Sequence, residues 1–203
     1  MFRHVEQDIE FEMCSLIKGL DRSKYKQNMD SRTFYNYVIC RYDPMIMGSN
    51  LLKTVNEPSI YGFILFLMTI FYIGKGKRAR MLSHLNEARK ILSKAISSKK
   101  PDVKDKAIIT EFLNDKGIVV IPIHDNSNCF ETFNRECLMI ECIGLEKLCN
   151  KIHGTSYGLE NWSENKRKNF GLMVLYSTYK RYINERLMPV KMNEILTREC
   201  NKF

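Results

Sequence analysis

Hydrophobic residues recur at intervals of three or four positions in several parts of the chain, a spacing typical of helices with one buried face. The first stripe consists of Ile9, Met13, Leu16, Ile17 and Leu20. A second consists of Met81, Leu85, Ala88, Leu92 and Ile96, and a third of Leu172, Leu175, Tyr176, Tyr179, Ile183 and Leu187. We therefore predict a long final helix carrying the third stripe, and helices over residues 5–20, 79–98, 103–115 and 130–148, the last with a break near Gly144.

Other segments have the composition of strands and loops. We predict strands in three segments rich in β-branched and aromatic residues, namely 33–40, 69–74 and 117–124. Residues 21–31 and 43–59 are polar or contain glycine and proline, which predicts a turn and a long loop. The apolar run over residues 60–73 is too short to span a bilayer, so we expect a buried core segment and no membrane span. Together these elements predict an α+β fold, with a small, mainly antiparallel sheet of about three strands flanked by helices.

Length and composition predict a single domain. The chain has 203 residues, of which 44% are hydrophobic, and this allows one domain with a real core. We predict that residues 33–188 form this domain, with residues 1–32 as a helical extension packed on the core and residues 189–203 as a C-terminal tail. The first residues lead into a charged helical pattern, so no signal peptide is visible. We expect an intracellular protein, in the nucleus, the cytoplasm or both.

The charge of the chain favours an anionic partner. The net charge is +9 and the isoelectric point is near 9.2. One group of basic residues consists of Lys75, Lys77, Arg78, Arg80, Lys94, Lys99 and Lys100, and a later group consists of Lys166, Arg167, Lys168, Lys180 and Arg181. Basic groups release counterions when they contact a phosphate backbone, which makes binding depend strongly on salt. For the later group, a solvated helix face is an equally good interpretation.

The seven cysteines, at positions 14, 40, 129, 137, 142, 149 and 200, form no C-x-x-C pair. Most occupy places that suit a small apolar side chain, so we predict reduced, buried thiols. A zinc site built from Cys137, Cys142, Cys149 and His153 is disfavoured because the spacing matches no structural zinc pattern.

The most specific chemistry lies between Tyr72 and His84. A strand is predicted to end there in a basic, glycine-containing turn, and a helix follows. Glycine lets a backbone approach a phosphate closely, and Arg80 and His84 stand one helical turn apart on the same face. An arginine binds phosphate oxygens with its forked donors, and a histidine exchanges a proton near neutral pH. The segment therefore suits a phosphodiester.

This segment resembles the reaction centre of the GIY-YIG endonuclease superfamily, most of all the nuclease module of animal endonucleases with ankyrin repeats and a LEM domain. The matching positions are Phe63, Phe66, Leu67, Thr69, Ile70, Phe71, Tyr72, Ile73, Gly74, Lys75, Gly76, Lys77, Arg80, His84, Leu85, Glu87 and Ala88. A second block runs from Glu136 to Leu145 and on to Leu148-Cys149-Asn150, and a third comprises residues 34–40 with Asp43-Pro44. The resemblance covers residues 34–187 and implies the α+β fold predicted above.

The resemblance also implies roles for individual residues. The catalytic set would be Tyr37, Tyr72, Arg80, His84 and Glu136, with Tyr61 as the alternative first tyrosine. Glu136 would hold the metal, Mg²⁺ with Mn²⁺ able to replace it. The substrate-binding set would be Gly74, Lys75, Lys77, Arg78 and Asn150. Each residue type also has a structural interpretation, such as a core tyrosine, a solvated arginine or a capping asparagine, and only the combined spacing favours catalysis.

The implied function is a metal-dependent DNA endonuclease that acts on branched or flapped DNA, as in DNA repair, and leaves 5′-phosphate and 3′-hydroxyl ends. Two alternatives stay open on the sequence. One is a catalytically silent nucleic-acid-binding module of the same fold, against which the intact catalytic set argues. The other is a protein-interaction scaffold that contacts partners through its first and last helices, and its binding would depend little on salt.

Overall fold

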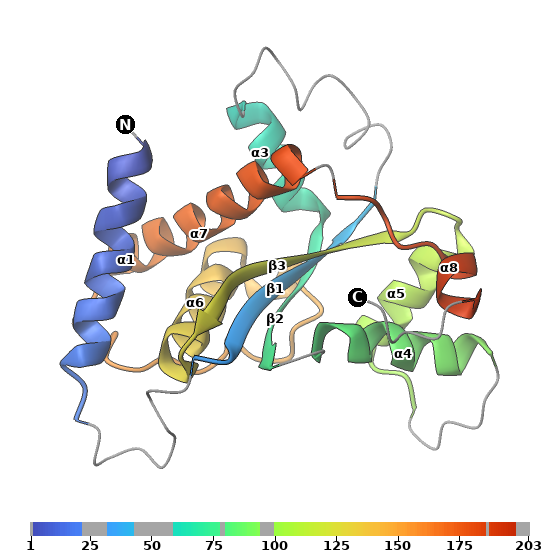
Figure 1. The fold of residues 1–203 in the computed structure, drawn as a ribbon, viewed down its shortest axis with the longest axis horizontal. Helices are drawn as coiled ribbons and strands as arrows, with labels where there is room; N and C mark the ends of the chain where they lie inside the picture. Colours follow the sequence, from blue (N-terminus) through green and yellow to red (C-terminus); the bar gives the residue numbers. More distant parts are fainter. Residues whose placement is uncertain are drawn as a thin grey trace.

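The computed structural model describes residues 2–21, 32–42, 59–77, 80–93, 100–185 and 187–197. Almost all of the predicted loop over 43–59, most of the predicted turn over 21–31, Arg78 and Cys200 lie outside the described residues. Within them, a three-stranded sheet is enclosed by helices on both faces (Figure 1). The predicted α+β fold is confirmed.

The sheet contains β1 (Phe34–Arg41), β2 (Ile70–Lys77) and β3 (Ile118–Ser127), in the order β2-β1-β3. The central strand β1 pairs antiparallel with both neighbours. Alternate residues of a strand point to opposite faces of the sheet. Tyr35 and Tyr37 accordingly belong to one hydrophobic cluster, whereas Val38 and Cys40 belong to the other. The sheet therefore has two buried faces, and each needs its own cover of helices.

One face is covered by α6 (Cys129–Ile143) and α7 (Glu164–Glu185), together with α1 (Phe2–Lys18) and α3 (Ile60–Thr69). Helix α6 lies against the sheet, and α7 packs along α6 (Figure 1). Helix α6 begins with a capping box formed by Asn128 and Glu131. It ends where Gly144 adopts a φ of 97°, which is the predicted break, and the short 3-10 helix η3 (Leu145–Lys147) follows.

The opposite face is covered by α4 (Arg80–Leu92) and α5 (Val103–Leu113), on the right in Figure 1. Residues beyond 188 take part in this layer: Val190 forms a backbone bridge with Ile118, and α8 (Met192–Thr197) packs on α4. The fold therefore continues through the described part of the segment that we predicted as a tail.

The apolar run over 60–73 contains two elements rather than one. Residues 60–69 form α3, whose first turn is capped by the Ser59 hydroxyl, which accepts the Gly62 N–H at 2.9 Å. Strand β2 begins at Ile70. Helix α3 buries Phe63 and Phe66 but exposes Ile60, Tyr61, Ile64 and Met68, so it is a surface helix and only its inner side matches the expected core segment. Among the described residues, no helix combines the length and the apolar character needed to cross a membrane.

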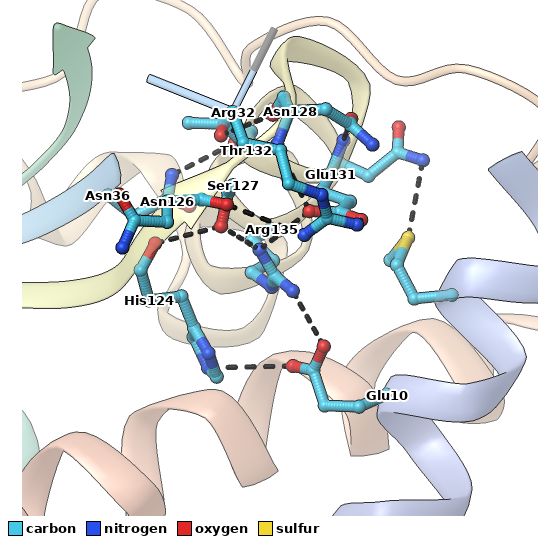
Figure 2. A network of polar contacts seen from close by, with 12 residues as sticks. Glu10, Arg32, Asn36, His124, Asn126, Ser127, Asn128, Glu131, Thr132 and Arg135 are labelled. Carbon is cyan, nitrogen blue, oxygen red and sulfur yellow. Dashed lines mark hydrogen bonds and ion pairs between the residues drawn. The ribbon is translucent and has the colours of Figure 1, made fainter. Parts of the chain in front are cut away.

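Helix α1 is tied to the junction of β3 and α6 by polar contacts (Figure 2). The guanidinium of Arg135, which is 3% exposed, donates to Glu10 Oε2 at 2.6 Å and to Ser127 Oγ at 2.7 Å. His124 Nε2 lies 3.5 Å from the other oxygen of Glu10. Glu131 supplies a second carboxylate, 3.9 Å from Arg135. A buried arginine needs such partners, so this network fixes where α1 packs.

Candidate active site

A polar cleft of about 330 Å³ opens beside the end of β2. It is lined by Tyr72, Lys75, Arg80, His84, Glu87, Asp102, Lys104, Glu136, Ile140, Cys149, Asn150, Lys151, Ile152 and Gly154. The wall thus includes four of the five residues predicted to be catalytic and two of those predicted to bind substrate. They come from β2, α4, α6 and the segment after η3, so only the folded chain brings them together.

Tyr37 lies behind the cleft wall and connects two of its residues. The side chain is 1% exposed, and its hydroxyl oxygen lies 2.7 Å from His84 Nε2. Its hydroxyl also hydrogen-bonds with that of Tyr72, and the two ring centroids are 6.2 Å apart. Tyr61, the alternative first tyrosine, is 57% exposed on α3 and does not line the cleft. The structure therefore brings Tyr37, and not Tyr61, to the site.

Burial makes both tyrosines weaker acids than a free tyrosine. It raises the pKa of Tyr37, and the neighbouring Tyr72 adds to the rise while Arg80 opposes it. Burial likewise raises the pKa of Tyr72, with the Glu136 carboxylate as the next cause. Both hydroxyls therefore carry their protons at neutral pH, and the pair is a chain of hydrogen-bonded hydroxyl groups.

Two glycines of β2 make room for side chains of the site. Tyr37 is paired with Gly74 on the neighbouring strand, and a Cβ at Gly74 would come within 2.3 Å of Tyr37 Cζ. A Cβ at Gly76 would come within 2.4 Å of Arg80 Cβ. Gly74 is buried under the tyrosine ring. The structure thus explains why glycine occupies these two positions: the absence of a side chain leaves space for Tyr37 and Arg80. The sequence alone did not suggest this role.

Glu136 projects from α6 into the cleft and is 6% exposed. Its Oε2 forms an ion pair with Lys75 Nζ, and the same ammonium lies 4.2 Å from the centroid of the Phe133 ring. Burial raises the pKa of Glu136 above its ordinary value, although the hydrogen bond and charge of Lys75 act in the opposite direction. At the cleft wall, Glu136 is therefore a desolvated carboxylate held by one lysine.

The donor set of the cleft suits only certain metals. Among the described residues, no three His, Cys, Asp or Glu side chains lie close enough together to hold an ion. Mg²⁺ is usually held by one or two carboxylates, with water and substrate phosphate oxygens completing an octahedron. Glu136 at an open cleft fits that pattern, provided that Lys75 gives up its contact with Oε2. A structural zinc site does not fit, and the six described cysteines form no disulfide.

Asn150 holds the middle of β2 through both polar groups of its side-chain amide. Its Oδ1 accepts the Ile73 N–H at 3.0 Å, and its Nδ2 donates to the Ile73 carbonyl at 2.7 Å. The side chain thus pairs with the strand as a neighbouring backbone would. Lys77, which we predicted to bind substrate, is exposed and lies over the Phe34 ring at 4.1 Å, away from the cleft wall.

Four residues that position the site were not identified from the sequence. The Tyr35 hydroxyl accepts the Met81 N–H at 3.1 Å and so satisfies a donor in the first turn of α4. Lys104 Nζ lies 2.8 Å from His84 Nδ1. Asp102 and Asp105 form a capping box at the start of α5 and hold Lys104 between their carboxylates. The Asp-x-x-Asp spacing could have predicted that capping box. The two-residue spacing of Tyr35 and Tyr37 could have predicted that both side chains lie on the same face of the sheet.

The later basic group is largely matched by acidic partners. The ion pairs are Lys166 with Glu12, Arg167 with Glu141, Lys168 with Glu164 and Arg181 with Glu185. Lys180 lies over the Tyr176 ring at 5.4 Å. This arrangement favours the interpretation of the group as a charge-balanced helix face.

Comparison with known proteins finds relatives among curated animal proteins. The chain is 31% identical over 176 residues to the ankyrin repeat and LEM domain-containing protein 1 homolog of Caenorhabditis elegans. This match covers 83% of this chain and 24% of the relative. The chain is 27% identical over 134 residues to ankyrin repeat and LEM domain-containing protein 1 of Mus musculus, covering 66% of this chain and 25% of the relative. The chain therefore spans about a quarter of the length of these curated relatives. No solved structure shows a significant match to the chain.

The family comparison covers every element of the site. The model of the LEM-3-like GIY-YIG domain matches residues 34–197, from the start of β1 to the end of α8. The match includes the tyrosines of β1 and β2, the arginine and histidine of α4 and the glutamate of α6. The resemblance stated from the sequence is confirmed, and the chain belongs to the LEM-3-like GIY-YIG domain family, a family of nuclease domains.

Proposed function

We propose that this chain is a metal-dependent DNA endonuclease that hydrolyses phosphodiester bonds in the cleft. The observation that carries the proposal is the convergence of Tyr72, Arg80, His84 and Glu136 on one polar cleft. Phosphodiester hydrolysis needs a positioned water, donors for the phosphate oxygens and a cation for the developing charge. The cleft offers a side chain suited to each requirement, whereas a silent binding module has no need of the whole set.

Arg80 and Lys75 would bind the scissile phosphate. Arg80 stands at the first position of α4, where the N-terminal end of the helix also favours an anion. Lys75 reaches the cleft from β2 and is already bound to a carboxylate there. A phosphate oxygen would replace that carboxylate as the partner of Lys75. The same exchange would free Glu136 for a metal ion.

Glu136 would hold Mg²⁺ together with water and a phosphate oxygen, and Mn²⁺ would be able to replace it. When bound, the ion supplies positive charge next to the phosphate and the leaving oxygen. The Tyr72 hydroxyl would orient the attacking water from the wall of the cleft. Tyr37 and His84 hold that hydroxyl in place through the hydrogen bonds described above.

We propose branched or flapped DNA, cut to give 5′-phosphate and 3′-hydroxyl ends, and the relatives that are named for ankyrin repeats and a LEM domain support this choice. An intracellular site of action, in the nucleus or the cytoplasm, follows from DNA as the substrate.

The test is cleavage of end-labelled flap, four-way and linear duplex DNA, with and without Mg²⁺. We expect the wild type to cut the branched substrates only with metal. We expect Glu136→Gln to bind them and leave them intact. Glu146→Gln is the matched control because Glu146 is an exposed carboxylate outside the cleft, and it should cut like the wild type. Binding without cutting by the wild type would instead support the silent module.

A further inference from the structure

Both ring nitrogens of His84 have a close polar partner inside the protein. Nε2 faces the Tyr37 hydroxyl at 2.7 Å, and Nδ1 faces the ammonium of Lys104 at 2.8 Å. The side chains of His84 and Lys104 are buried, with residue exposures of 3% and 7%. A contact of this length between two buried groups restricts which nitrogen of the imidazole can carry a proton.

Lys104 decides the direction of the hydrogen bonds. An ammonium has three donors and no acceptor, so the facing Nδ1 must accept with its lone pair. The proton of a neutral imidazole is then on Nε2, which donates to the Tyr37 oxygen. The Tyr37 proton is left to point to Tyr72, its other partner. The Glu87 carboxylate, 4.0 Å from Nδ1, lies beyond hydrogen-bond distance and does not replace Lys104.

The start of α5 holds Lys104 in place. Its ammonium lies 3.9 Å from Asp102 Oδ2 and 3.7 Å from Asp105 Oδ1. Asp105 is 2% exposed, and its Oδ1, which has no hydrogen-bond partner among the described residues, forms an ion pair with Lys104. The remaining oxygens of both aspartates bind each other's backbone N–H in the capping box. The cap thus anchors the lysine as well as the helix.

We propose that Lys104 is a positioning residue that holds His84 in its neutral, Nε2-protonated form. The resulting series of donors runs from Lys104 through His84 and Tyr37 to the Tyr72 oxygen at the cleft wall. In this arrangement both ring nitrogens of His84 are engaged in the resting enzyme, Nε2 with the Tyr37 hydroxyl and Nδ1 with Lys104. Lys104 therefore acts on the reaction through His84.

The test combines a spectroscopic measurement with kinetics on the full chain. In ¹⁵N-histidine-labelled protein, long-range ¹H–¹⁵N correlation spectra distinguish the two tautomers, and the spectrum of His84→Gln identifies the His84 signals. We expect the Nε2–H pattern in the wild type and its loss in Lys104→Met. We expect Lys104→Arg, which keeps a charged donor, to restore the pattern. Lys106→Met, an exposed position on the same helix, should leave it unchanged.

The kinetic part rests on the proposed function, and the spectroscopic part does not. We expect Lys104→Met to lower the cutting rate at saturating DNA about tenfold or more with KM unchanged, because a His84 that no longer donates to Tyr37 leaves the Tyr72 hydroxyl less well placed to orient the attacking water. An Nδ1–H or doubly protonated His84 in the wild type would overturn the proposal. So would Lys104→Met with the wild-type tautomer. A wild type that does not cut DNA would refute the endonuclease, while the tautomer would still decide the role of Lys104.

Discussion

The aromatic ring of Tyr37 lies directly across Gly74 of the neighbouring strand. The two residues are paired in the antiparallel ladder, and a Cβ at position 74 would lie 2.3 Å from Cζ and 2.5 Å from the hydroxyl oxygen of the ring. These atoms belong to a buried side chain whose hydroxyl is bound to His84. A side chain at position 74 must therefore displace Tyr37, and with it the hydrogen bond to His84.

Gly74→Ala should reduce both stability and cutting. The added methyl group forces a buried ring out of its place, and overpacking of this kind costs about 1–3 kcal/mol. Breaking the Tyr37–His84 hydrogen bond should lower the cutting rate as well. Urea unfolding and cleavage assays measure the two effects. In a Tyr37→Ala background the methyl group meets no ring, so the stability cost of Gly74→Ala should largely disappear. An equal cost in both backgrounds would contradict the steric explanation.

The position of Tyr37 also predicts which tyrosine begins the catalytic set. Tyr37→Phe removes only the hydroxyl that joins His84 to Tyr72, so the cutting rate should fall by about 10²–10⁴-fold with little change in DNA affinity. Tyr61→Phe changes an exposed side chain on α3 and should leave the rate within about twofold of the wild type. Single-turnover cleavage by both variants is the measurement. A larger effect of Tyr61→Phe would reverse the assignment.

Much of the fold was predictable because most elements have a clear period. The stripes predicted the helices α4 and α7, and the composition of the three strands predicted their bounds to within about three residues. Helix α3 was not predicted, since its ten residues are apolar on all sides and show no period to read. Neither its cap at Ser59 nor its exposed side is visible in such a pattern.

The candidate site was predictable where it depends on local spacing. Arg80 and His84 stand on one helical turn, and Tyr72 precedes them in the same motif, so the sequence pointed to all three. Lys104 escaped because its contact with His84 exists only when α5 packs against α4, at a separation of 20 residues. The role of Asn150 escaped for the same reason, since its partner Ile73 is 77 residues away.

Asn150→Ala should destabilise the fold as well as impair the site. The substitution leaves the N–H and the carbonyl of Ile73 without their amide partner, and an unsatisfied buried group costs about 1–3 kcal/mol. A residue that only binds phosphate would affect cutting and leave stability unchanged. Urea unfolding separates the two roles, with Asn161→Ala as the control because Asn161 is exposed on the loop before α7. Equal stability of both variants would assign Asn150 to substrate binding alone.

Glu136→Gln should abolish cutting and yet stabilise the fold near neutral pH. Burial raises the pKa of Glu136, so the folded protein binds this proton more tightly than the unfolded chain does. The stability that the group contributes is complete below its ordinary pKa of 4.5 and is lost as the pH rises through the higher folded value. Glutamine carries no charge and avoids that loss.

We therefore expect the free energy of unfolding of Glu136→Gln to exceed that of the wild type near neutral pH. The difference should shrink as the pH falls toward 4.5, where the wild-type carboxyl is protonated in the folded state. Urea unfolding of both proteins across this range is the measurement. If Glu136→Gln is the less stable protein at neutral pH, and the two become more alike in acid, the ion pair with Lys75 outweighs the cost of burial.

The salt dependence of DNA binding should identify the basic residues that contact the phosphate backbone. Removing one cation that binds a backbone phosphate lowers the slope of log K against log salt by about 0.9 for duplex DNA. Lys151 is exposed and lines the cleft, so Lys151→Gln should lower the slope by about this amount.

Lys168→Gln should leave the slope unchanged, since Lys168 lies 2.6 Å from Glu164 and the pair brings no net charge to that part of α7. An exposed pair is weak, within about 1 kcal/mol, so local charge balance and not the strength of the pair is what the measurement tests. Equal decreases in both variants would extend the DNA surface onto α7 and restore the basic group there as a binding site.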